Sequence, residues 1–242
     1  TKFAEHCTTA LENYNRCVKR GREYTPRFTI NNAPVQMQEY LLRLYAGGYN
    51  TLYDSATSWI EPTDQALFDA VDKLEENHVS VSEEEFLEFF NAWMLSICDM
   101  STAIGHTIPD AIRLKVRPSY NGYGLIKDWE FPKVIREIMA WNAVTEIEMA
   151  WKRVLKEAFM DSAQPDNGKL YVDISRVKTR YDESHEWYKC EQCSELTPYL
   201  LRGKCPICGS SHVHLMHSDE YEALSFWRKP VADALHGALI HV

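Results

Sequence analysis

Four cysteines near the C-terminal end constrain this chain more than any other feature. Cys190 and Cys193 form one Cys-x-x-Cys pair, and Cys205 and Cys208 form a second pair after an interval of eleven residues. Two residues between cysteines allow a tight turn to direct both sulfurs to one point. Two such turns supply the tetrahedron of thiolates that a structural Zn²⁺ site requires. We therefore predict Zn²⁺ as the cofactor, with these four cysteines as its ligands.

The residues around the second pair favour the same interpretation. Pro206 fixes the entry into the turn, and Gly209 allows the left-handed backbone with which amide N–H groups can point at sulfur. Four cysteines complete a closed four-coordinate site, so the nearby histidines are expected to face solvent. These histidines are His212, His214 and His217. A closed site has no position for a reactive water, and the metal is expected to be structural.

Three other interpretations of the cysteines stay open, although the spacing favours zinc. Disulfides are disfavoured because the chain shows no secretory signal, and because Cys7, Cys17 and Cys98 lie in helical patterns as ordinary buried thiols do. A redox Cys-x-x-Cys is normally a single pair at the start of a helix. Four cysteines could also hold an iron–sulfur cluster.

Most of the chain before the cysteines is predicted to be helical, because apolar residues recur at three- and four-residue spacing. Helices are expected over residues 2–20, over VQMQEYLLRLYA after Pro34, in the runs after Thr63 and Ser82, and as one long helix over residues 130–160. Thr63 and Ser82 are candidate N-caps, and three glutamates after Ser82 suit a helix N-terminus. An aromatic face in this part is expected to pack in the core. Its residues are Phe86, Phe89, Phe90, Trp93 and Ile97.

A change of pattern follows residue 163. Residues 164–168, QPDNG, form a turn cluster and the best candidate domain boundary. After it, Leu170, Val172 and Ile174 alternate with other residues, which predicts a strand. The predicted fold class is therefore mainly α: a helical domain over residues 1–163, then a strand and a small β-rich four-cysteine zinc ribbon over 164–218. A C-terminal helix and an apparent truncation occupy 219–242.

Composition limits the classes of function. The formal charge of −9 argues against a protein that coats nucleic acid nonspecifically, but it allows a local basic face. The sequence contains no run of eighteen apolar residues and no signal peptide, so we expect no membrane partner and a cytoplasmic location. Thr1 and Val242 are interpreted as cuts in a longer protein.

A search for catalytic patterns finds no phosphate-binding Gly-x-x-x-x-Gly-Lys-Ser/Thr, no Gly-x-Ser-x-Gly and no His-Glu-x-x-His. We therefore predict no catalytic residue in this chain. An enzyme with an unrecognised site around His106, Tyr120 and Tyr123 stays open as an alternative.

The cysteine pairs would hold out the loop of residues 194–204. Aromatic and basic side chains on a stiff loop suit stacking on nucleic acid and pairing with phosphate, and they equally suit docking on another domain. The candidate contacts are Tyr199, Arg202 and Lys204 in this loop, with Arg176, Lys178 and Arg180 before it. Glutamates at 183, 186, 191 and 195 largely offset the positive charge, which weakens the case for DNA.

Residues 187–216, followed by YEALSFWRKPV at 221–231, resemble the accessory region of large bacterial superfamily 2 helicases of the Lhr-like and related types. Several of these helicases belong to anti-phage defence systems. In them a four-cysteine knuckle pair lies beyond the two motor domains, and an aromatic-Arg-x-Pro-Val stretch leads into the rest of the polypeptide. The resemblance implies a noncatalytic accessory domain that contacts DNA or a neighbouring domain, with any ATPase activity in parts of the parent protein outside this chain.

The alternative to this interpretation belongs to a different class. In a protein–protein interaction module, the acidic helical region would bind a partner and the zinc ribbon would serve as a staple.

Overall fold

The computed structural model describes residues 15–16, 19–20, 35–47, 51–118, 124–126, 128–141, 145–162 and 168–224. The helix predicted over residues 2–20 lies largely outside these residues. So does the part of the predicted C-terminal helix that follows residue 224. The described chain combines helices with small antiparallel sheets, in agreement with a mainly α composition.

Seven α-helices lie in the described part of the chain. They are α2 (Val35–Ala46), α3 (Asp64–Glu76), α4 (Glu83–Met100), α5 (Asp110–Val116), α6 (Lys133–Ile138), α7 (Glu146–Phe159) and α8 (Ser218–Glu222). Two short 3₁₀ turns, η2 (Tyr53–Ser55) and η3 (Ile174–Arg176), precede β1 and β5. The strands are β1 (Ser58–Pro62), β2 (Leu125–Ile126), β3 (Met160–Ser162), β4 (Lys169–Val172), β5 (Val177–Tyr181), β6 (Tyr188–Cys190), β7 (Leu196–Thr197) and β8 (Val213–Leu215).

The strand predicted from Lys169 is present as two strands, β4 and β5, separated by η3. Both pair with strands from earlier in the chain. β5 lies antiparallel to β1, with Trp59 opposite Arg180, and β4 lies between β2 and β3. Residues 169–181 are thus built into the same body as the helices, and the domain limits at 163 and 218 stay a prediction.

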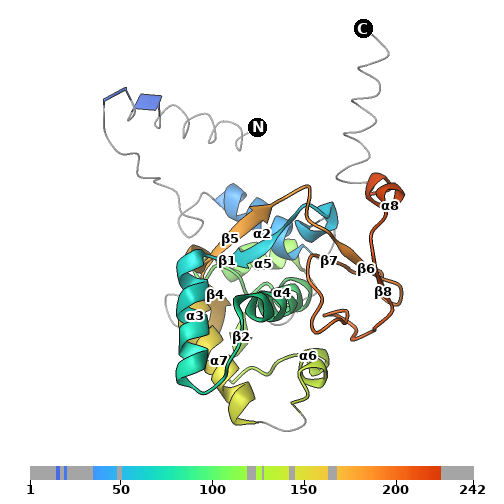
Figure 1. Ribbon diagram of the computed structural model, residues 1–242. Helices are drawn as coiled ribbons and strands as arrows, with labels where there is room; N and C mark the ends of the chain where they lie inside the picture. Colours follow the sequence, from blue (N-terminus) through green and yellow to red (C-terminus); the bar gives the residue numbers. More distant parts are fainter. Residues whose placement is uncertain are drawn as a thin grey trace.

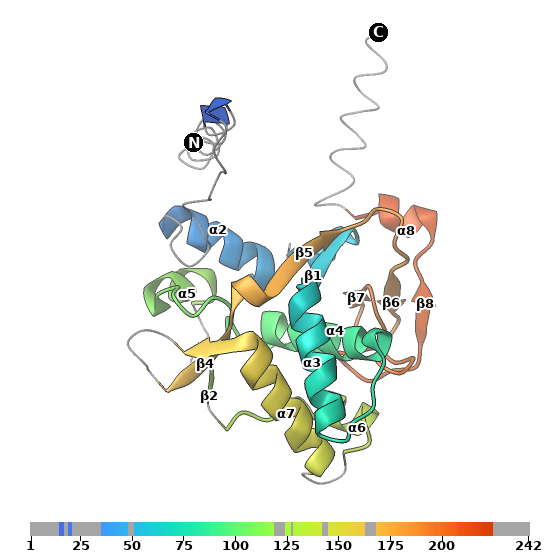
Figure 2. The same cartoon turned by 60° about the vertical axis from the view of Figure 1, so that its left-hand side comes forward.

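Helix α4 lies in the middle of the molecule (Figures 1 and 2). Helices α3 and α7 cover one side of it, and the ribbon strands β6, β7 and β8 lie on the other side. Phe86 stacks on Trp151 of α7 with ring centroids 5.5 Å apart, and Phe89 lies 4.1 Å from the same ring. The aromatic face predicted for this helix is confirmed as core, because its five residues are at most 2% exposed.

The predicted helix starts are confirmed. The Thr63 hydroxyl accepts the Ala66 N–H at the start of α3. Ser82 and Glu85 form a reciprocal capping box at the start of α4, which satisfies two backbone donors that a helix would otherwise leave unpaired. VQMQEYLLRLYA forms α2 with the limits that Pro34 and Gly47 suggested.

The single helix predicted over residues 130–160 is wrong, because the chain forms α6 and α7 there instead. Ala140 takes a left-handed conformation with φ of 60°, and the Trp141 N–H donates to the Arg136 carbonyl at 2.8 Å. This is the hydrogen bond of a Schellman cap, which ends a helix. Trp141 then packs 5.8 Å from Phe89 in the core. A continuous amphipathic pattern concealed this break, because apolar residues lie on both sides of it.

We expect Phe89→Ala to lower the free energy of unfolding by about 3–5 kcal/mol, because it leaves a cavity between α4, α6 and α7. Phe68 on α3 is the matched control, since its side chain is 63% exposed and Phe68→Ala should change stability by less than about 0.5 kcal/mol. Urea unfolding followed by circular dichroism measures both. Equal small effects of the two substitutions would contradict the placement of Phe89 in the core.

Candidate metal centre

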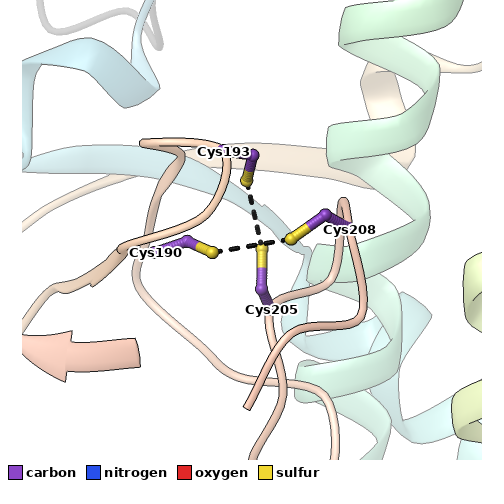
Figure 3. Close-up of side chains that lie close together, drawn as sticks. All are labelled: Cys190, Cys193, Cys205 and Cys208. Carbon is purple, nitrogen blue, oxygen red and sulfur yellow. Dashed lines mark hydrogen bonds between the residues drawn. The ribbon is translucent and has the colours of Figure 1, made fainter. Parts of the chain in front are cut away.

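The four predicted ligands meet at one point (Figure 3). β6 ends at Cys190, the first turn carries Cys193, and the second turn brings Cys205 and Cys208 to face them. All four Sγ atoms lie within 4.8 Å of one another, with Cys190 and Cys208 at 3.5 Å and Cys193 and Cys205 at 3.7 Å. Tetrahedral Zn–S bonds of about 2.3 Å require sulfurs about 3.8 Å apart, whereas a disulfide requires about 2.05 Å. The separations fit ligands around a metal ion and do not fit disulfides.

The backbone of both turns points N–H groups at sulfur. The Cys190 thiol accepts from the backbone N–H groups of Gln192 and Cys193. In the second turn, the Cys205 thiol accepts from Ile207 and Cys208 in the same way. The two turns therefore repeat one pattern, which stabilises negative charge on the first sulfur of each pair.

The residue after each pair is left-handed. Gly209 has φ of 76°, as its sequence position predicted, and Ser194 occupies the equivalent place after Cys193 with φ of 63°. Ser194 was not anticipated, because a serine at such a position gives a weaker signal than a glycine does.

The electrostatics of the cluster favour a divalent cation. Burial by itself would raise the pKa of Cys190, but the N–H groups of its turn and the neighbouring thiols lower it to about 7. Burial raises the pKa of Cys205 to about 11, and burial together with the other thiols raises that of Cys193 further. On its own the cluster would keep the thiols of Cys193 and Cys205 protonated at neutral pH. A bound Zn²⁺ would remove those protons and balance the charge of four thiolates.

The histidines downstream lie apart from the sulfurs. Within the described residues, the cysteine cluster is the group of His, Cys, Asp and Glu side chains that could hold a metal ion. His212 and His217 are exposed, as predicted. His214 differs from the prediction, since it is half-buried and its Nε2 lies 3.0 Å from the Glu220 carboxylate.

The ribbon is attached to α4 by a buried polar contact. Asn91 is 1% exposed, and its side-chain amide donates to the Thr197 hydroxyl at 3.0 Å and to the Tyr199 carbonyl at 3.3 Å. The sequence analysis did not identify Asn91. Its signal was a polar residue inside the aromatic run of α4, where a buried amide needs a partner from elsewhere in the fold.

The tip of the loop over residues 194–204 also contacts the helices. We call residues 201–204 the tip of the ribbon hairpin. Leu201 and Lys204 exchange two backbone hydrogen bonds of 3.0 Å around a turn made by Arg202 and Gly203, both with positive φ. Leu201 is buried in the shared core. The Arg202 N–H donates to the Glu88 carboxylate of α4 at 3.1 Å. The loop that sequence analysis expected to extend outward is therefore folded against the chain's own helices at this tip.

The structure spreads the six predicted contact residues over η3, β5 and the ribbon. Tyr199 donates its hydroxyl to Glu61 at 3.2 Å, and Arg202 reaches the Met139 carbonyl at 3.4 Å. Two basic residues near β1 pair with acids: Lys178 lies 2.5 Å from Asp64, and Arg180 lies 3.8 Å from Asp182. Arg176 and Lys204 are exposed.

Part of the alternative catalytic site can be placed. His106 lies 3.9 Å from the Asp161 carboxylate, at the side of β3. Tyr120 and Tyr123 lie outside the described residues. Among the helices of the described part of the chain, none combines the length and apolar character needed to cross a membrane.

Comparison with known proteins finds one similarity at low identity. Over 226 residues the chain is 21% identical to Druantia protein DruE of Escherichia coli (strain UMEA 4076-1), and the alignment covers 89% of this chain. It covers 12% of that protein, so the chain spans about one eighth of its length. No protein-family model and no solved structure matches the chain.

We expect purified protein to contain about one Zn²⁺ per chain, and Cys205→Ser to reduce this to about none, because three sulfurs no longer close the site. Elemental analysis measures the metal directly. Cys98→Ala is the control, since Cys98 is a buried thiol within α4 and should leave zinc content unchanged. Wild-type protein without metal, or with iron in place of zinc, would overturn the assignment.

Proposed function

We propose that this chain is a noncatalytic accessory module of a large anti-phage defence protein, with one structural zinc ion that fixes its C-terminal ribbon. The observation that carries the proposal is the convergence of four sulfurs in a ribbon that packs on α4. The similarity to part of Druantia protein DruE supports the link to defence and to a larger parent. A helicase parent and a cytoplasmic location belong to the same proposal.

The donor set argues for a structural role of the metal. Four thiolates would fill the coordination shell of Zn²⁺, which leaves no position for a water or a substrate. Cys190 and Cys205 are also 2% and 0% exposed, so the metal would lie against the protein. When bound, the ion would supply a crosslink between two turns. Contact with a partner would then be made by side chains of the protein, and the metal would only hold the two turns in place.

Contact with DNA is the finer part of the proposal. Arg176, Lys178 and Arg180 lie on or beside β5, and Lys204 lies at the tip of the ribbon hairpin. Asp64 and Asp182 neutralise part of this charge. Few phosphate contacts would remain, so the binding is expected to be weak and sensitive to salt.

A second function, a protein–protein interaction module, is favoured by a separate observation. Tyr199 and Arg202, the most distinctive residues of the loop, make contacts with Glu61 and Glu88 of the same chain. The ribbon would then act as a staple, and the acidic surface of the helices would receive the partner.

A DNA titration separates the two functions. We expect single-stranded DNA to bind with a salt slope of roughly −2, as about three phosphate contacts would give, and Arg176→Glu to weaken binding roughly tenfold at low salt. Lys73→Glu is the control, because Lys73 lies in the last turn of α3 and pairs with Glu157 of α7 instead of with β5 or the ribbon. Fluorescence anisotropy at several salt concentrations gives both quantities. Absence of binding at low salt would rule out the DNA contact and favour the interaction module.

A further inference from the structure

A cleft of about 360 Å³ lies where the ribbon meets the helical core. Its walls come from three separate parts of the chain: the turn between α3 and α4 with the first turns of α4, residues 139–141 at the end of α6 with the first turns of α7, and the tip of the ribbon hairpin. Trp141, Trp151 and Ile147 supply apolar lining, and Glu85 and Glu88 supply carboxylates. The volume and the mixture of an apolar lining with a few polar groups are typical of a ligand site.

Backbone strain is concentrated at this cleft. Five non-glycine residues with positive φ are found in the described part of the chain, and His78, Ala140 and Arg202 among them line the cleft, one from each wall. A left-handed non-glycine residue costs about 1 kcal/mol or more, and such residues cluster at binding sites.

Two carboxylates and one guanidinium lie among the side chains that line the cleft. Glu85 and Glu88 come from α4, and Arg202 comes from the ribbon. Glu88 is half-buried, and burial together with Glu84 and Glu85 raises the pKa of its carboxyl group. A carboxylate that is partly removed from water beside two others gains most from a cation placed next to it. Arg202 offsets part of this effect, because its backbone N–H donates to the Glu88 carboxylate and its positive charge lies near it, while its guanidinium donates to the Met139 carbonyl.

We propose that this cleft receives an arginine side chain, followed by an apolar residue, from another polypeptide. The guanidinium would pair with Glu88. The apolar residue would lie against Ile147, which is 49% exposed on α7. Charge complementarity with Glu85 and Glu88 supports this occupant and disfavours a phosphate-bearing ligand. The inference deepens the interaction function proposed above, because it names the surface and the chemistry of the partner.

The cleft also depends on the ribbon, since Leu201 and Arg202 of the hairpin form one wall. Removal of zinc is therefore expected to open the cleft, although no ligand of the metal lines it. Besides holding the zinc, the ribbon would therefore complete a recognition site on the helical core.

The test uses short peptides as probes on the full chain. Ac-Arg-Leu-NH₂ is the cationic probe, and the same peptide with citrulline is its neutral isostere. We expect the arginine peptide to bind with Kd of about 1 mM and the citrulline peptide about tenfold more weakly, as loss of one charge-assisted contact implies. Saturation-transfer NMR measures the affinities, and a shift of the Ile147 methyl resonance locates the site.

Matched variants make the result decisive. Glu88→Gln keeps an oxygen acceptor for the Arg202 N–H but removes the charge, and should abolish the difference between the two peptides. Glu76→Gln, near the end of α3 and outside the cleft lining, should preserve it. Zinc content is measured in both variants.

Equal affinity of the arginine and citrulline peptides, no binding by either, or tighter binding of Ac-phosphoserine-Leu-NH₂ would overturn the inference. Discrimination for arginine in protein that lacks zinc would support the cleft while contradicting the zinc site. Zinc-loaded protein that fails to discriminate would leave the zinc site in place and remove the cleft proposal.

Discussion

The convergence of four thiols is the constraint on which the C-terminal part of this structure depends. The ribbon strands are two or three residues long, and a sheet of this size does not hold its own shape in water. Its buried apolar side chains, Trp187, Leu201 and Met216, belong to the same cluster as the aromatic residues of α4. The ribbon therefore has no separate core. A metal crosslink would fix its turns, and that fixed shape would hold these three apolar side chains in the core of the helices.

A buried polar contact adds specificity to this apolar attachment. Hydrophobic burial is not directional, so Leu201 and Trp187 alone would permit several positions of the ribbon on α4. The amide of Asn91 can satisfy its donors only when Thr197 and the Tyr199 carbonyl are in place. A displaced ribbon would leave a buried amide unpaired, at a cost of about 1–3 kcal/mol. The arrangement that pairs the Asn91 NH₂ group also brings Arg202 to the cleft.

The local features of this fold could be predicted, but the long-range ones could not. Cysteine spacing predicted the convergence of the four sulfurs, and residues 35–46, Thr63 and Ser82 predicted helix limits, because each signal lies within a few residues of chain. The pairing of β1 with β5 joins residues more than one hundred positions apart, and no periodicity specifies such a partner. The break at Ala140 was missed because alanine is the strongest helix former and gave no local warning of a left-handed conformation.

That same break places backbone strain at the wall of the cleft. Helices α3 and α6 both end in a Schellman bond, from Val79 to the Leu74 carbonyl and from Trp141 to the Arg136 carbonyl, with His78 and Ala140 at the position where glycine is preferred. Glycine would relieve the strain at either site. Packing must therefore hold both caps, and Trp141 in the core provides that packing at the second of them. His78 and Ala140 line the cleft together with Leu201 and Arg202 of the ribbon hairpin. The backbone strain at these two helix ends is therefore offset by the contacts that form the cleft, and not by local sequence preference.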